Sequence, residues 1–247
     1  MGLGGRAAPR HFTRSRSDQP GGAHAGAPLT SVSVAGVGRT FDSSSVRLIA
    51  ITDSLRDGPR GLALRAAAAV FGGATMIQLR LKEESARTLV EIARTIQAMI
   101  PDVPLIVNDR ADVALAAGAA GVHVGVDDLA PALLRRVMPP GFVIGASVGN
   151  DDEVARSAGA DYVGIGPVYM TGSKSDAGTA IGPARFGELA RRCALPAVAI
   201  GGITSERVAD VLAAGASGVA VISALFGASD PTQAARAIRS SLDASGR

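Results

Sequence analysis

The stretch MIQLRLK, residues 76–82, is the clearest fold signal in the chain. From position 77 onward, apolar side chains alternate with the polar or cationic Gln78, Arg80 and Lys82. A β-strand sends alternate side chains to opposite faces. The stretch therefore predicts a strand with one apolar face and one face that carries three hydrogen-bonding groups, two of them cationic.

Short apolar runs of this kind recur eight times, and amphipathic helical patterns separate them. The runs are RLIAIT (47–52), MIQLR (76–80), LIVN (105–108), GVHV (121–124), VIGA (143–146), YVGIG (162–166), AVAIG (197–201) and GVAVI (218–222). The helical patterns lie near 60–71, 85–100, 110–117, 130–138, 151–158, 184–193, 204–214 and 232–242. Strands that alternate with helices pair in parallel through right-handed crossovers.

Eight such units in roughly 200 residues predict an α/β fold, a single-domain (β/α)₈ TIM barrel over residues 46–247. A doubly wound sheet is the alternative. The regularity of the eight units and the lack of an early GxGxxG fingerprint disfavour it.

Composition excludes several classes of protein. Of the 247 residues, 47% are apolar, but only 3% are aromatic and none is Trp, so aliphatic side chains must build the core. No apolar run reaches eighteen residues, so no membrane span is expected. Cys193 is the one cysteine, which excludes an internal disulfide framework and a cysteine-rich zinc site.

Residues 1–45 differ from the rest of the chain. They are rich in Gly, Ala, Ser, Arg and Pro, and their five Arg and two Asp supply the whole net charge of +3. We expect a disordered N-terminal extension. It lacks a signal-peptide core and resembles an organelle transit peptide, but we favour a misassigned start or a GC-rich bacterial extension and hence a cytoplasmic protein.

The rest of the chain is neutral, without clustered cations or stacking aromatics, so neither nucleic acid nor membrane is an expected partner. The oligomeric state, a homo-oligomer included, stays open.

In this fold the active site lies at the carboxyl ends of the strands. The apolar side chains of MIQLRLK belong against the helices, so Gln78, Arg80 and Lys82 point to the barrel axis. Cations are costly to bury there without an anion. The stretch predicts either an anion-binding wall or internal salt bridges to nearby aspartates.

Carboxylates follow the next two strands. Asn108 and Asp109 come after the third strand, and Asp127 and Asp128 follow the fourth. Each could be only a helix cap. Together they predict a Mg²⁺ site with Asp109 and Asp128 as ligands and Asp127 as a solvent or capping residue. His123, on the fourth strand, could line the barrel, but we expect it to satisfy a core hydrogen bond.

The remaining strand ends carry phosphate-binding features. Ser147 follows the fifth strand, and the long loop 166–182 contains Lys174 among small and hydroxyl residues, which is typical of a flexible flap. A merely flexible surface loop is the alternative.

Glycines follow the seventh strand (IGGI, 200–203), and Ile222 and Ser223 follow the eighth. Glycine lets backbone N–H groups approach an anion closely, and these two loops, with a helix N-terminus, form the recurrent phosphate site of the fold.

Taken together, seven motifs resemble the thiamine-phosphate synthase family over about residues 47–230. They are QLRLK (78–82), ND (108–109), GVHVGVDDL (121–129), GASV (145–148), DYVGIGPVYMTGSK (161–174), AIGGI (199–203) and VAVISAL (219–225). No single motif is decisive, but seven in register on successive strands are highly specific.

The resemblance implies a transferase that joins a hydroxymethylpyrimidine diphosphate to a thiazole phosphate and releases pyrophosphate. It implies Mg²⁺ on Asp109 and Asp128. It also implies that Gln78, Arg80, Lys82, Asn108, Ser147 and Lys174 bind the pyrimidine diphosphate, and that Thr171, Gly172, Ser173, Gly202, Ile222 and Ser223 bind the thiazole phosphate. Arg80, Lys82, Lys174 and Ser147 are the implied catalytic residues, and the bond to pyrophosphate would break to leave a pyrimidine-stabilised cation.

Some positions depart from the family pattern. Leu81 stands where the family often has Glu, Ser173 replaces a frequent Thr, and Gly149 stands where a His is common. Related thiazole tautomerases use a His there and generally lack the diphosphate-binding set. A tautomerase-like isomerase and a non-catalytic phosphate-binding barrel are therefore the alternatives.

Overall fold

A computed structural model describes residues 1–2, 41–172 and 178–245. Eight parallel strands pair in sequence order, and β1 pairs with β8 to close the barrel. The strands are β1 (Leu48–Ile51), β2 (Met76–Leu79), β3 (Leu105–Asn108), β4 (Gly121–Val124), β5 (Val143–Val148), β6 (Tyr162–Ile165), β7 (Ala197–Ile200) and β8 (Gly218–Val221). The expected (β/α)₈ barrel is confirmed.

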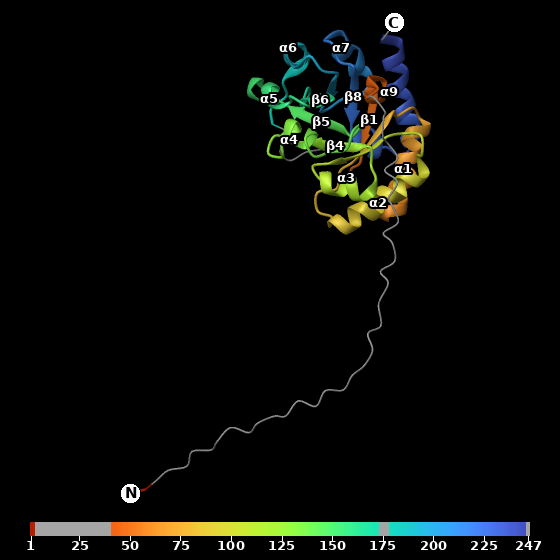
Figure 1. Cartoon of the computed structure of the whole chain (residues 1–247). Coiled ribbons are helices and arrows are strands. Elements are labelled where there is room, and N and C mark those ends of the chain that lie inside the picture. Colours follow the sequence, from red (N-terminus) through yellow and green to blue (C-terminus); the bar gives the residue numbers. More distant parts are fainter. Residues whose placement is uncertain (3–40, 173–177, 246–247) are drawn as a thin grey trace. The chain divides into compact units, whose positions relative to one another are not determined.

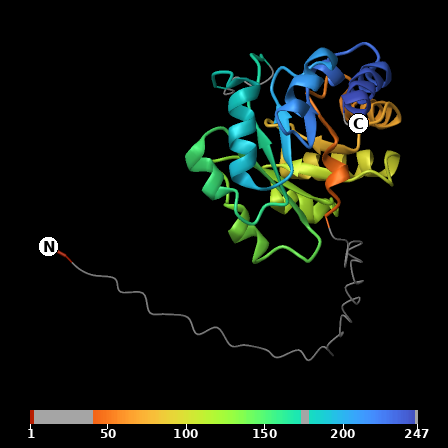
Figure 2. The same ribbon diagram turned by 90° about the horizontal axis from the view of Figure 1, so that it is seen from above.

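Helices surround the strands (Figures 1 and 2). They are α1 (Gly58–Phe71), α2 (Ala86–Met99), α3 (Ala111–Ala117), α4 (Pro131–Arg135), α5 (Asp151–Arg156), α6 (Gly182–Cys193), α7 (Val208–Ala213), α8 (Ser223–Phe226) and α9 (Pro231–Ser245), with 3₁₀ turns η1 (Ser43–Val46) and η2 (Ser205–Arg207). The short helix α8 lies between β8 and α9, outside the helical patterns identified in the sequence. Within the described ranges, no helix is long and apolar enough to cross a membrane.

The apolar side chains form two layers. A large outer layer fills the space between strands and helices and includes Ile77 and Leu79, with Leu81 packed against its edge. A smaller inner layer lies inside the barrel and includes Met76. The alternation in MIQLRLK therefore has the predicted orientation, because its apolar residues from 77 onward face the helices and Gln78, which is 4% exposed, lies inside.

Phe41, which we had placed in the N-terminal extension, packs with Val46, the first residue of the expected barrel domain, against the inner apolar layer. Val46, at the end of η1, is fully buried, and the Phe41 ring stacks on Tyr162 with their centroids 6.2 Å apart. In the described part of the chain, packing against the barrel thus extends back to Phe41. These residues shield the inner apolar layer from water at the amino ends of the strands. Residues 3–40 lie outside the described part of the chain.

The seam between β1 and β8 leaves no room for a side chain at Gly218. A Cβ atom there would overlap the carbonyl oxygen of Val46, next to the hydrogen bond from Val219 N to Arg47 O (3.1 Å). We expect Gly218→Ala to lower the free energy of unfolding by about 1–3 kcal/mol in urea denaturation, since the closing strands must separate. Gly172→Ala, where a Cβ would meet open space, is the matched control. Equal stability of Gly218→Ala and the wild type would contradict this account of the seam.

Candidate active site

A cavity of about 420 Å³ opens at the carboxyl ends of the strands. Ten of the residues predicted from sequence line it together. They are Arg80, Lys82, Asn108, Asp109, Asp128, Ser147, Thr171, Gly202, Ile222 and Ser223. Residues from β3, β5 and α8, and from the segments after β2, β3, β4, β6, β7 and β8, thus meet at one place, as the topology of a parallel barrel requires.

Gln78 lies beneath this cavity. Its side-chain Nε2 donates a hydrogen bond to Asn108 Oδ1 at 2.8 Å, which joins β2 to β3. Because the bond occupies the Asn108 oxygen, the Asn108 amide nitrogen remains as its donor group. Gln78 therefore orients Asn108, which itself lines the cavity.

The backbone of Arg80 is held by Thr52, a fully buried residue just after β1. The Thr52 hydroxyl accepts a hydrogen bond from Arg80 N at 2.8 Å and donates one to Arg80 O at 3.2 Å. Sequence reasoning missed Thr52, although a polar residue that ends an apolar run is a visible signal. The two bonds fix the base of the Arg80 side chain at the rim of β2.

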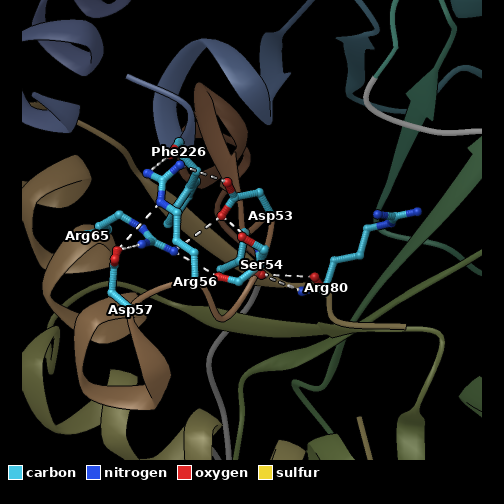
Figure 3. Close-up of polar contacts among 8 residues, drawn as sticks. Asp53, Ser54, Arg56, Asp57, Arg65, Arg80 and Phe226 are labelled. Carbon is cyan, nitrogen blue, oxygen red and sulfur yellow. Dashed lines mark hydrogen bonds and ion pairs between the residues drawn. The ribbon is translucent and has the colours of Figure 1, made fainter. Parts of the chain in front are cut away.

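The loop that follows Thr52 is itself anchored by Arg65 of α1, which is only 9% exposed (Figure 3). The Arg65 guanidinium pairs with Asp57, donates to Ser54 O at 2.8 Å and lies 3.4 Å from Asp53 Oδ1. In Figure 3 the Arg80 side chain extends away from this cluster. The charges of the cluster are thus satisfied locally, and Arg80 is directed elsewhere.

Asp109 and Asp128 face each other across the ends of β3 and β4. Burial, followed by the charge and hydrogen bond of Asp128, raises the pKa of Asp109 to about 6, and Lys82 and Arg80 act in the opposite direction. Asp109 adopts a left-handed backbone conformation (φ 63°), and its N–H donates to His123 O at 2.8 Å. Asp128 Oδ2 accepts from Gly125 N at 2.7 Å. Two carboxylates held this close are a hard oxygen donor set, which suits a divalent cation.

The salt-bridge alternative for the cations is not realised at Arg80. Among the described residues, no ion pair joins Arg80 to Asp109 or Asp128, although the charge of Arg80 partly opposes the rise in the pKa of Asp109. Asp127 is exposed at the rim, as expected of a solvent residue.

Ser147, near the end of β5, lies between the cavity and the barrel interior. Its Oγ is 3.1 Å from His123 Nε2, and His123 Nδ1 is 3.0 Å from the Tyr162 hydroxyl. His123 thus satisfies a core hydrogen bond, as expected. Its partner Ser147 also touches the cavity.

Glu153 is a cavity residue that sequence reasoning missed. Its Oε2 accepts from Gly149 N and its Oε1 from Asn150 Nδ2, both at 2.6 Å. Asn150 in turn caps α5 by accepting from the N–H groups of Asp152 and Glu153. The N-x-x-E spacing at residues 150–153 is a capping-box signal that could have identified it.

The loops after β6 and β7 meet at Gly202. Gly201 and Gly202 both have positive φ, at 95° and 62°, and a Cβ on Gly202 would lie 2.6 Å from Met170 O. Arg207 fastens this contact, because its Nη1 donates to Gly202 O at 2.6 Å and its guanidinium carbon lies 4.5 Å from the centroid of the Tyr169 ring. This turn and the start of α8 at Ser223 line the same side of the cavity.

Besides Gln78, which lies beneath the cavity, three predicted residues are not placed at it. Gly172 is exposed and does not line it, whereas Ser173 and Lys174 lie outside the described residues. The described cavity can still hold an anion between Arg80 and Lys82, a cation between Asp109 and Asp128, and a second anion against the backbone of the glycine turn.

Comparison with known proteins identifies relatives over most of the barrel. A family model described as thiamine monophosphate synthase matches residues 48–225. A thiamine-phosphate synthase of Xanthobacter autotrophicus is 50% identical over 199 residues, which cover 79% of this chain and 94% of that protein. A thiamine-phosphate synthase of Methanoculleus marisnigri is 53% identical over 175 residues, which cover 69% of this chain and 83% of that protein.

Among solved structures, a thiamine phosphate pyrophosphorylase from Pyrococcus furiosus superposes with a TM-score of 0.73 and 33% sequence identity, covering 82% of this chain and 98% of that one. The family model spans well over half of the chain, and the matches cover 94% and 83% of the two relatives. From the barrel, the cavity and these relatives together, it follows that the chain belongs to the thiamine monophosphate synthase family.

Proposed function

We propose that this protein is a thiamine-phosphate synthase, which joins 4-amino-2-methyl-5-hydroxymethylpyrimidine diphosphate to 4-methyl-5-(2-hydroxyethyl)thiazole phosphate and releases pyrophosphate. The observation that carries the proposal is the composition of one cavity. Two cations, two adjacent carboxylates and a glycine turn line it together. The relatives that are half identical to this chain bear the same function in their names.

The cation side of the cavity suits the diphosphate. Arg80 and Lys82 would neutralise its charge, and Asn108, oriented by Gln78, would donate a hydrogen bond to it. Lys174, which the family pattern adds from the β6–α6 loop, would contribute a further positive charge. The opposite side, with Gly202 and Ser223, would hold the thiazole phosphate through backbone N–H groups and the hydroxyl, with Thr171, Ser173 and Ile222 around it.

Asp109 and Asp128 fit Mg²⁺. Burial, and after it the charge of Asp128, raises the pKa of Asp109, and a bound dication would offset both effects by stabilising the ionised carboxylate. When bound, Mg²⁺ would supply Lewis-acid stabilisation of the departing pyrophosphate. We assign the cation as Mg²⁺ because both donors are carboxylate oxygens and because the proposed diphosphate substrate would bind beside them.

The reaction needs no protein nucleophile. The carbon–oxygen bond to pyrophosphate breaks with its electron pair on the leaving group, and the electron-rich aminopyrimidine stabilises the methylene cation until the thiazole nitrogen attacks it. Arg80 and Lys82 stabilise the charge that develops on the leaving group. The barrel walls hold the second substrate beside the cation and exclude water, which would otherwise trap it.

Pyrophosphate release by the purified protein tests the proposal directly. We expect release only when the pyrimidine diphosphate, the thiazole phosphate and Mg²⁺ are all present, with thiamine phosphate formed in equal amount and EDTA as the metal-free control. Absence of release by a protein that still binds the thiazole phosphate would reject the synthase assignment, and a tautomerase assay would then be the next measurement.

Lys82→Ala should cut kcat by about 10²-fold or more, because a charge that stabilises the transition state is lost while the barrel core is untouched. The measurement is steady-state kinetics, with circular dichroism as a check on folding. Arg87→Ala is the matched control, since Arg87 is an exposed cation on α2 outside the cavity. Near-wild-type turnover of Lys82→Ala would remove this residue from the anion site.

Asp109→Asn should abolish the stabilisation of the protein by Mg²⁺ with pyrophosphate. In the wild type, ligand at a hundredfold excess over Kd adds about 2.7 kcal/mol to stability, which raises Tm by several degrees. Asn tolerates the left-handed backbone conformation at position 109, so the variant should fold. Asp127→Asn, a neighbouring exposed carboxylate, should retain the full shift. An unchanged shift in Asp109→Asn, measured by thermal unfolding, would show that the metal binds elsewhere.

A further inference from the structure

Three side chains form a hydrogen-bonded row from the barrel interior to the cavity. Tyr162 on β6 is 1% exposed, His123 on β4 is 9% exposed, and Ser147 on β5 reaches the cavity. The Tyr162 hydroxyl is 3.0 Å from His123 Nδ1, and His123 Nε2 is 3.1 Å from Ser147 Oγ. The two rings lie close together, with centroids 5.6 Å apart.

The strands between and beside these side chains are built to make room for them. Gly145 lies opposite both His123 and Tyr162 in the strand register, and Gly164 lies opposite Ser147. A Cβ at Gly145 would overlap the Tyr162 ring, and one at Gly164 would lie 3.2 Å from His123 Cε1. The Tyr162 ring also stacks on Phe41. The row is therefore held in one arrangement by its surroundings.

The direction of the hydrogen bonds follows from Tyr162. Full burial raises the pKa of its hydroxyl, so the hydroxyl keeps its proton. In the described part of the chain, His123 Nδ1 is the acceptor within reach of that proton. The opposite arrangement, with Nδ1 protonated, would leave a buried hydroxyl proton without an acceptor, which is unfavourable.

An imidazole that accepts at Nδ1 and is neutral carries its proton on Nε2. Nε2–H then donates to Ser147 Oγ and occupies a lone pair of the hydroxyl oxygen. The hydroxyl proton of Ser147 cannot point back toward His123, so it is available to an acceptor atom in the cavity.

We propose that Tyr162 and His123 are positioning residues that present the Ser147 hydroxyl as a hydrogen-bond donor to the pyrimidine diphosphate. The proposal rests on the proposed function, because it takes its ligand from that reaction. It assigns a task to a buried pair that the charge-stabilising mechanism leaves unused. A donor directed at an acceptor atom of this substrate would hold it in place without reorganisation as the bond to pyrophosphate breaks.

The tautomer of His123 is the first test, and it does not depend on activity. ¹⁵N-histidine-labelled protein should show His123 protonated at Nε2 and unprotonated at Nδ1, with the signals assigned by their loss in His123→Gln. A His123 protonated at Nδ1 would overturn the proposal.

Kinetics with paired variants form the second test. Tyr162→Phe keeps the ring but removes the hydroxyl that fixes the tautomer of His123, and we expect kcat to fall about tenfold. In Ser147→Ala, kcat should fall about 10²-fold. Because the pair acts through Ser147, Tyr162→Phe should have no further effect in the Ser147→Ala background. His123→Gln, whose amide can still donate at the Nε2 position, should retain more activity than His123→Leu.

Phe41→Leu is the matched control for packing, since Phe41 stacks on the Tyr162 ring but carries no hydrogen-bonding group. It should leave kcat unchanged in both backgrounds. A tenfold loss from Tyr162→Phe that persists in the Ser147→Ala background would show a merely structural role and overturn the proposal. If the protein formed no thiamine phosphate at all, the proposed function would fail, and the tautomer measurement would still decide whether the pair orients Ser147.

Discussion

The closing of β8 onto β1 is the constraint on which the rest of this structure depends. Once the sheet is closed, every strand ends on the same rim, and the interior is too narrow for anything but side chains. Gly218 permits this closure because it lets the backbone around Val46 approach β8 directly. The cavity at the other end exists because residues separated by more than a hundred positions are brought to one ring.

Polarity changes along the barrel axis. The lower interior is apolar and is covered by Phe41 and Val46. Gln78 and His123 form a middle layer in which each polar side chain has a partner. Above them, at the rim, lie Arg80, Lys82 and the carboxylates. This gradient confines the ionised groups to the rim, where ligands can reach them, and leaves the core beneath them apolar.

Asp109 shows what such a site costs. Its backbone is in a conformation that is uncommon for a residue with a side chain, and its carboxyl lies beside Asp128. Both features are unfavourable for folding, and both are understandable if the position is selected to bind a cation. The surrounding bonds, from Asp109 N to His123 O and from Gly125 N to Asp128 Oδ2, hold the two carboxylates together against this cost.

The sequence by itself determined the barrel and the ring of residues on its rim. The period of two in runs such as 76–82 identifies a strand and also determines which side chains point to the barrel axis. It also indicated Arg80, Asp109, Asp128 and the glycine turn, since strand ends are recognisable locally. Only the tertiary structure decided what supports them. The contacts of Thr52 with Arg80, of Tyr162 with His123 and of His123 with Ser147 join separate segments whose partners leave no local pattern. Their pairing follows from the register and closure of the sheet and not from spacing along the chain.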